Sequence, residues 1–234
     1  MSRSGPDDAA LPALRDLSRQ AVAHALVRAQ THAQPRAVSG GAENGEPWPV
    51  AVDGTAGNGH DTLFLARLVG ARGVVHAFDV QPGALARTAE RLAAAGLDGR
   101  VTLHGRGHEE LAAALAAPLV MPLAGPDTGG VCPLRVTAAM FNLGFLPGSD
   151  RRVTTRPDTT LAALDGLLPL LAAGGVVSLH VYAGHPGGAD EAAALDQRLA
   201  GLDWDRWRVA RYEFANKPRN PERLLLVYRL PDRA

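Results

Sequence analysis

The sequence predicts an α/β fold with a seven-stranded, mostly parallel sheet, helices on both faces and one antiparallel strand near the edge. Three observations support this fold. Apolar runs alternate with segments of helical spacing along most of the chain. A glycine-rich turn, DGTAGNGHD, joins the first apolar run to a helical segment. The last two runs, RWRVARYEFA and RLLLVYRL, have no helical stretch between them, so they should pair antiparallel at one sheet edge.

The elements follow from these patterns in chain order. Residues 1–10 are expected to be disordered, and residues 11–234 to form a single domain that begins with a helix at 11–33. That helix is indicated by Leu14, Leu17, Ala21, Val22, Ala25, Leu26 and Ala29, which recur at helical spacing. A polar stretch rich in Gly and Pro, 34–48, separates it from the first strand.

Strands and helices then alternate. The apolar runs predict strands at about 49–54, 73–79, 100–104, 136–142, 174–182, 206–214 and 223–230. Helical spacing predicts helices at about 60–70, 82–96, 108–117, 157–172 and 188–200, with a long Pro/Gly loop at 118–135. Seven strands with one antiparallel member near the edge are the layout of the Rossmann-like class I methyltransferases.

Composition narrows the classes of function. With 234 residues, 46% of them hydrophobic, the chain can bury a sizeable core, and its formal net charge of zero means that any RNA contact needs a local patch. The single cysteine, Cys132, excludes a disulfide framework and a thiolate metal cluster, and the scattered histidines predict no metal site. No apolar stretch approaches the roughly 20 residues of a membrane span, and no signal peptide is recognisable, so the expected location is cytoplasmic.

The glycine turn predicts a nucleotide-like ligand. Gly57 and Gly59 follow the first strand, where glycine lets the backbone turn tightly and approach a ligand closely. The next helix offers its N-terminal N–H groups. Asp79 ends the second strand, and a carboxylate there can accept hydrogen bonds from two ribose hydroxyls.

The details of the turn favour S-adenosylmethionine over other cofactors. The dinucleotide motif requires a small third residue, whereas Thr62 occupies that position, and no P-loop lysine follows. S-adenosylmethionine carries a ribose but no phosphate, so it needs the turn and the acid without the third glycine. Asp53, at the end of the first strand, can face its cationic amino end, or alternatively cap the amides of the turn.

A second cluster follows the fourth and fifth strands. Ligands of open α/β sheets bind outside the carboxyl ends of the strands, so Asn142 should face the same crevice as Gly57 and Asp79. An asparagine there suits the orientation of a substrate amine or amide, or else it completes a turn. Tyr182 and His185 lie at or just beyond the end of the fifth strand.

The loop after the fourth strand is charged. Its arginines, Arg151, Arg152 and Arg156, are interleaved with Asp150 and Asp158. The arginines can pair with phosphate, or the stretch can be a solvated face.

Several stretches together resemble the YtqB/MnmM family of class I methyltransferases. They are DGTAGNGHDTLFLA, FDVQ, GHEE, FNLGFLPGSD, Thr159-Thr160, VYAGHPGGADE and NKPRNPERLLLVYR, in the order of the family and over roughly residues 15–230. The resemblance implies an S-adenosylmethionine-dependent RNA methyltransferase that modifies the primary amine of 5-aminomethyl-2-thiouridine at the tRNA wobble position. The implied partner is the tRNA anticodon stem-loop.

The resemblance also implies roles for individual residues. Cofactor contacts fall on Asp53, Thr55, Gly57, Asn58, Gly59, His60, Asp61, Thr62, Asp79, Gln81, His108 and Glu109. The resemblance puts the substrate amine near Asn142, with Leu143, Gly144, Tyr182, His185 and Pro186 nearby. The catalytic candidates are therefore Asn142, Tyr182 and His185, and Asp150 and Arg151 of the charged loop join Leu143, Gly144 and Pro186 as substrate-binding candidates. The chain departs from the family at Gly54, where alanine is usual, and in the longer stretches at 34–47 and 118–135.

Other functions share parts of this pattern. An rRNA methyltransferase would use the same cofactor site. An NAD-dependent oxidoreductase would share the first strand–turn–helix unit but would leave the NLGF cluster without a role. A non-catalytic RNA-binding module would bind RNA without the cofactor. The sequence leaves the oligomeric state open, a homodimer included.

Overall fold

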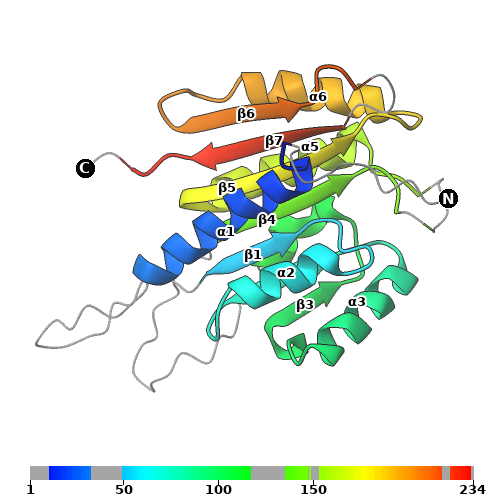
Figure 1. Ribbon diagram of the computed structural model, residues 1–234, viewed down its shortest axis with the longest axis vertical. Coiled ribbons are helices and arrows are strands. Elements are labelled where there is room, and N and C mark those ends of the chain that lie inside the picture. Colours follow the sequence, from blue (N-terminus) through cyan, green and yellow to red (C-terminus); the bar gives the residue numbers. More distant parts are fainter. Residues whose placement is uncertain are drawn as a thin grey trace, which may run out of the picture.

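A computed structural model of the chain describes residues 11–32, 49–116, 135–146, 148, 153–217 and 222–232. The strands of these residues form a seven-stranded sheet in the order β3-β2-β1-β4-β5-β7-β6 (Figure 1). They are β1 (Val50–Asp53), β2 (Val74–Phe78), β3 (Val101–His104), β4 (Val136–Leu143), β5 (Leu171–Tyr182), β6 (Trp207–Glu213) and β7 (Glu222–Arg229). The strands predicted from the sequence are all present.

The sheet is mostly parallel, as predicted. β1 to β5 pair in parallel, whereas β7 is antiparallel both to β5 and to β6, which forms the edge. The parallel neighbours are joined through helices, while β6 and β7 follow each other without one. A connection without a helix brings the chain back antiparallel, which explains the one reversed strand.

Among the described residues, three helices cover each face of the sheet. One face carries α1 (Leu14–His32), α2 (His60–Leu68) and α3 (Pro82–Ala94), and the other carries α4 (Leu111–Ala116), α5 (Pro157–Leu167) and α6 (Gly188–Ala200). The buried side chains form two clusters, one under each set of helices. Short 3-10 turns lie at Asp98–Arg100, His108–Glu110 and Leu168–Leu170. No helix of the described residues is long and apolar enough to cross a membrane.

Some boundaries differ from the sequence prediction. The helix expected at 157–172 ends at Leu167, and β5 already begins at Leu171. Pro169, in the 3-10 turn between them, cannot donate a helical hydrogen bond, which explains the early end. The stretch expected as a helix at 108–117 starts as a 3-10 turn. The predicted disorder at 1–10 and the loop at 118–135 lie outside the described residues.

The alternation of side chains along β4 positions the site. Met140 packs in the cluster under α1 and α2, whereas Phe141 and Leu143 pack under α5. Because successive residues of a strand face opposite sides, Asn142 lies on the α1–α2 side at the carboxyl end of β4. Its Cα partner on β5 is His180.

Candidate active site

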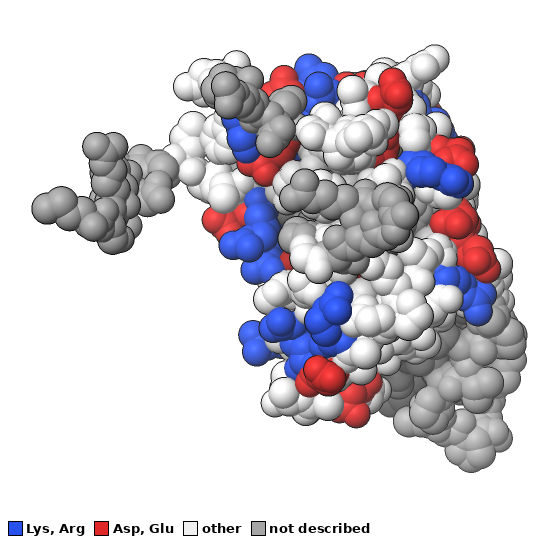
Figure 2. Space-filling view, turned by 90° about the vertical axis from the view of Figure 1, so that its right-hand side faces the viewer, with Lys and Arg blue, Asp and Glu red and all other residues white. Residues whose placement is uncertain are grey.

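The glycine turn after β1 adopts backbone conformations that favour glycine. The carboxyl ends of β1, β4 and β5 point to the right in Figure 1 and toward the viewer in Figure 2. At the end of β1, Gly57 has φ 54° and Gly59 has φ 76°, and Gly59 is the N-cap residue of α2. A Cβ on Gly59 would lie 2.9 Å from the Cα of Thr88 in α3. The second glycine therefore lets the turn pack against α3.

Replacement of Gly59 by alanine is expected to destabilise the protein more than the same change at Gly96. Both glycines have a positive φ, so both variants should lose about 1–2 kcal/mol from backbone strain. A Cβ on Gly96 would meet nothing within 4 Å, whereas the one on Gly59 would overlap α3 and cost about 1–3 kcal/mol more. Urea denaturation of both variants checks this expectation, and equal losses would contradict the packing role of Gly59.

Asp79 is held in place by the backbone of two loops. Its Oδ2 accepts a hydrogen bond from the Gly57 N–H at 2.8 Å, and its Oδ1 accepts one from the Gln81 N–H at 2.8 Å. The residue is only partly buried, so its remaining lone pairs can face a ligand. The carboxylate predicted to bind a ribose is thus oriented by the same turn that contains Gly57.

Asp53 is completely buried at the end of β1. Its Oδ1 accepts a hydrogen bond from the Thr55 N–H at 3.1 Å, and its Oδ2 accepts one from the Thr62 hydroxyl at 2.6 Å. Burial, with a smaller contribution from the charge of Asp61, raises the pKa of the Asp53 carboxyl to about 7. These bonds are those of a carboxylate that caps its own turn, the alternative role considered for this residue.

The raised pKa predicts how Asp53 affects stability. Because the folded state retains a proton that the unfolded state releases above a pKa of 3.8, the associated stability is fully present below that pH and is lost as pH rises through about 7. The Asp53→Asn variant cannot ionise. Its free energy of unfolding should therefore increase relative to the wild type between pH 4 and pH 7, by up to about 1.4 kcal/mol per pH unit.

Denaturation of both proteins across this range measures the difference, with Asp98→Asn as an exposed control. Parallel pH profiles for the wild type and Asp53→Asn would show that the buried carboxyl has an ordinary pKa.

Asn142 is fixed by contacts from α2 and the glycine turn. Its side-chain Nδ2 donates to Asp61 Oδ2 at 2.9 Å, and its backbone N–H donates to the Thr55 hydroxyl at 2.7 Å. Asp61 Oδ1 accepts hydrogen bonds from Arg19, the shorter at 2.7 Å. Since Nδ2 is directed at Asp61, the Oδ1 of Asn142 remains as an acceptor. A residue from the first helix thus orients, through Asp61, the asparagine that the sequence predicts at the centre of the site.

Tyr182 is stacked on His180 at the end of β5. The ring centroids lie 4.5 Å apart, and 42% of Tyr182 is exposed, so the outer side of its ring can receive a planar group. Its hydroxyl lies 3.4 Å from His180 Nδ1, and His180 Nε2 lies 3.3 Å from Glu222 Oε2. Burial raises the pKa of Tyr182, which keeps its hydroxyl protonated.

His185 lies against Gly144, as the sequence predicts for residues of one site. A Cβ on Gly144 would be 3.4 Å from His185 Nε2. His185 Nδ1 lies 3.0 Å from the carbonyl oxygen of Pro186, which assigns the ring proton to Nδ1. The Nε2 lone pair is buried and has no hydrogen-bond partner among the described residues. This nitrogen is therefore available as a proton acceptor.

His108 closes the other side of the glycine turn. Its Nδ1 lies 3.3 Å from the carbonyl oxygen of Gly54, and burial lowers the pKa of its imidazole. Its Nε2 is likewise buried without a partner in the described part of the chain. The adjacent Glu109 is exposed. His108, which is predicted to contact the cofactor, thus has one ring nitrogen, Nε2, that could bind a ligand.

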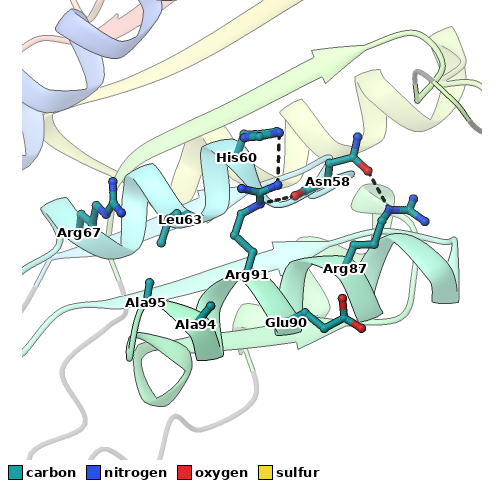
Figure 3. A pocket seen from close by; sticks show the side chains of 9 residues that line it. All are labelled: Asn58, His60, Leu63, Arg67, Arg87, Glu90, Arg91, Ala94 and Ala95. Atoms are coloured by element: carbon teal, nitrogen blue, oxygen red, sulfur yellow. Dashed lines mark hydrogen bonds between the residues drawn. The ribbon is translucent and has the colours of Figure 1, made fainter.

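The side chains of three predicted contact residues point elsewhere in this structure. The side chains of Asn58 and His60 line a groove between α2 and α3 (Figure 3), where Asn58 Oδ1 accepts a hydrogen bond from Arg87, so they lie apart from the crevice at the strand ends. The side chain of Leu143 is fully buried in the core beneath α5, so it cannot contact a substrate. Asp150 and Arg151 lie outside the described residues.

Gly54 is more than a minor departure from the family pattern. A Cβ at this position would lie 2.1 Å from Cε1 of the Phe141 ring. An alanine here would therefore require the ring to move.

Sequence reasoning missed several supporting residues. No sequence motif indicates Arg19, because its role depends on a contact with Asp61, which lies 42 residues away in the sequence. Glu191 is completely buried and accepts hydrogen bonds from the Thr155 and Thr160 hydroxyls, at 2.8 and 2.6 Å. Thr155 Oγ1 also accepts from the Gly144 N–H at 2.8 Å. A carboxylate at the start of α6 thus anchors the loop beside Asn142. No cluster that could hold a metal ion occurs among the residues described.

Known proteins resemble this chain over most of its length. A chloroplastic tRNA (mnm(5)s(2)U34)-methyltransferase of Arabidopsis thaliana is 34% identical over 177 residues, which cover 73% of this chain and 60% of that protein. The chain thus spans less than two thirds of this relative. The crystal structure of a "putative rRNA-methylase" from Clostridium thermocellum is 34% identical, with a TM-score of 0.68 and coverage of 79% of this chain and 90% of that one.

A second crystal structure extends over nearly the whole chain. It is SMU.1697c of Streptococcus mutans, a "putative methyltransferase" in complex with SAH, with 28% identity, a TM-score of 0.71 and coverage of 94% of this chain and 100% of that one. The family model described as "Putative rRNA methylase" matches residues 75–228, which contain β3 to β6 and nearly all of β2 and β7. These matches agree with the resemblance carried by the sequence motifs, and the chain belongs to the "Putative rRNA methylase" family.

Proposed function

We propose that this protein is an S-adenosylmethionine-dependent methyltransferase that acts on the primary amine of 5-aminomethyl-2-thiouridine at the wobble position of tRNA. The observation that carries the proposal is Asn142, fixed by Asp61 at the carboxyl end of β4 and hydrogen-bonded to Thr55 of the glycine turn. An amine-orienting group thus adjoins the predicted cofactor turn. The tRNA methyltransferase of Arabidopsis and the SAH complex of the Streptococcus mutans protein support the substrate and the cofactor.

The residues around the turn fit S-adenosylmethionine. Gly57 keeps the backbone open beside Asp79, whose carboxylate is preoriented for two ribose hydroxyls. Gln81 adjoins Asp79 and His108 adjoins Gly54, and the Nε2 of His108 has no hydrogen-bond partner among the described residues. Asp53, behind the turn, supports it by accepting hydrogen bonds from Thr55 and Thr62. When bound, the cofactor supplies a methyl group already activated on a sulfonium.

The residues near Asn142 suit an amine acceptor. The Oδ1 of Asn142 can accept a hydrogen bond from an amine N–H and so direct the nitrogen lone pair. The exposed ring face of Tyr182 can stack on a base. An ammonium must release a proton before its nitrogen can be methylated, and His185 Nε2 is a candidate acceptor because it has no hydrogen-bond partner among the described residues.

The expected partner of this site is the anticodon stem-loop of tRNA. The Arabidopsis relative is chloroplastic, and the cytoplasmic location expected for this chain stays a prediction.

The test is methyl transfer from labelled S-adenosylmethionine to tRNA that carries the 5-aminomethyl group, followed by mass spectrometry of the nucleosides. The expected product is the 5-methylaminomethyl nucleoside at the wobble position. Unmodified tRNA and ribosomal RNA serve as parallel substrates. Methylation of ribosomal RNA alone would reassign the substrate, while binding of NAD without S-adenosylmethionine would overturn the proposal.

A further inference from the structure

A cationic groove lies on the face of α1, α2 and α3, apart from the active-site crevice. It has a volume of about 800 Å³ and is open to solvent between α2 and α3 (Figure 3). Arg67 contributes from α2, Arg87 and Arg91 contribute from α3, and Leu63 and Ala94 provide apolar lining. Arg87 and Arg91 are four residues apart and therefore lie on the same side of α3. Helices α2 and α3 thus both contribute guanidinium groups to this groove.

The helices on the two faces of the sheet differ in charge. Those of the groove face carry Arg15, Arg19, Arg28, Arg67, Arg87 and Arg91 against Asp16, Asp61 and Glu90. Those of the opposite face carry Arg198 against Asp158, Asp165, Asp190, Glu191 and Asp196. Positive charge is thus in excess on one face and negative charge on the other, although the chain is neutral overall. In Figure 2, large groups of Lys and Arg lie on the left. This is the side that faces the viewer in Figure 1, where α1 to α3 lie in front of the sheet.

The groove is joined to the cofactor turn. Arg87 Nε donates to Asn58 Oδ1 at 2.8 Å, and Arg91 Nε donates to the Asn58 carbonyl oxygen at 2.8 Å. A guanidinium has five N–H donors, so each arginine retains donors for an anion. Arg67 is exposed. Anions in the groove would therefore lie beside the glycine turn.

We infer that this groove binds the phosphodiester backbone of the RNA substrate. The inference rests on the proposed function, since a tRNA must approach the crevice and its phosphates need a local positive surface on a neutral protein. Guanidinium groups suit this role because they pair with phosphate through two parallel hydrogen bonds. The groove face supplies the arginines, whereas the acidic helices of the opposite face would repel the same backbone.

The test measures tRNA affinity and its dependence on salt in the Arg67→Gln/Arg87→Gln variant. Glutamine keeps the helices intact and can still donate to Asn58. Affinity for fluorescent tRNA should fall roughly tenfold to a hundredfold at physiological salt, and the slope of log K against log salt should become less negative by about two. Calorimetry with S-adenosylhomocysteine monitors the neighbouring turn and should show unchanged affinity. Arg198→Gln, on α6, is the matched control and should leave tRNA affinity unchanged.

A second variant is expected to act in the opposite direction. Glu90 is the carboxylate that lines the groove, and Glu90→Gln should strengthen tRNA binding severalfold because it removes repulsion of phosphate. A merely structural role of the groove would not produce a gain in affinity.

The outcomes separate the inference from the proposed function. If wild-type protein methylates tRNA while both groove variants bind it as the wild type does, the groove is not part of the RNA surface and the inference fails. If the wild type neither binds nor methylates tRNA, the proposed function fails. Saturable binding of inorganic phosphate that the double variant loses, with tRNA affinity unchanged, would assign the groove to a free anion and would also overturn the inference.

Discussion

The Asn142→Ala variant is expected to slow methyl transfer about a hundredfold or more while it binds S-adenosylmethionine as tightly as the wild type. The side chain of Asn142 is committed to Asp61 through Nδ2, and its Oδ1 is the group that can hold an amine in line. Loss of the side chain leaves the turn, Asp79 and His108 intact but frees the amine to rotate. Single-turnover transfer to tRNA bearing the aminomethyl group, together with cofactor calorimetry, separates the two effects.

A double-mutant cycle with Asp61→Asn tests how the asparagine is positioned. If Asp61 acts by holding Asn142, the second substitution should have little effect on the rate once Asn142 is alanine. Additive losses would instead show that Asp61 acts independently. A turnover of Asn142→Ala close to that of the wild type would remove the residue from the mechanism, and loss of cofactor affinity would move it into the donor pocket.

The Asp79→Ala variant is expected to bind S-adenosylmethionine roughly tenfold to more than a hundredfold more weakly, because it loses a charge-assisted hydrogen bond worth about 1.5–3 kcal/mol. It also releases the N–H groups of Gly57 and Gln81, which Asp79 now orients. Asp79→Asn keeps an acceptor but loses the charge, so its affinity should be intermediate.

Calorimetry with S-adenosylhomocysteine measures these affinities, and Asp98→Ala is the control at an exposed aspartate. Thermal unfolding shows whether each variant is folded. Wild-type affinity in a folded Asp79→Ala protein would rule out the ribose contact.

The sequence by itself determined the fold class and the strand ends that carry the site. The period of the apolar residues distinguishes strands from helices locally, and the absence of a helix between β6 and β7 required their antiparallel pairing. Gly57, Asp79 and Asn142 could be assigned to the same edge of the sheet, because the carboxyl ends of parallel strands meet there. The alternation of side chains along a strand also predicts that Leu143 faces away from Asn142. The prediction of Leu143 as a substrate contact followed the motif resemblance instead.

Only the tertiary structure decided which side chains touch. Asn142 and Asp61 are 81 residues apart in the sequence. Arg19, which binds Asp61, lies in α1, before the 34–48 stretch of the sequence. Asn58 turned to the outer groove because Arg87 of α3 supplies its hydrogen bond, which no local pattern around the turn contains. Local patterns fix elements and their faces, whereas contacts between distant segments depend on how the helices pack on the sheet, and that packing produced both the oriented asparagine and the cationic groove.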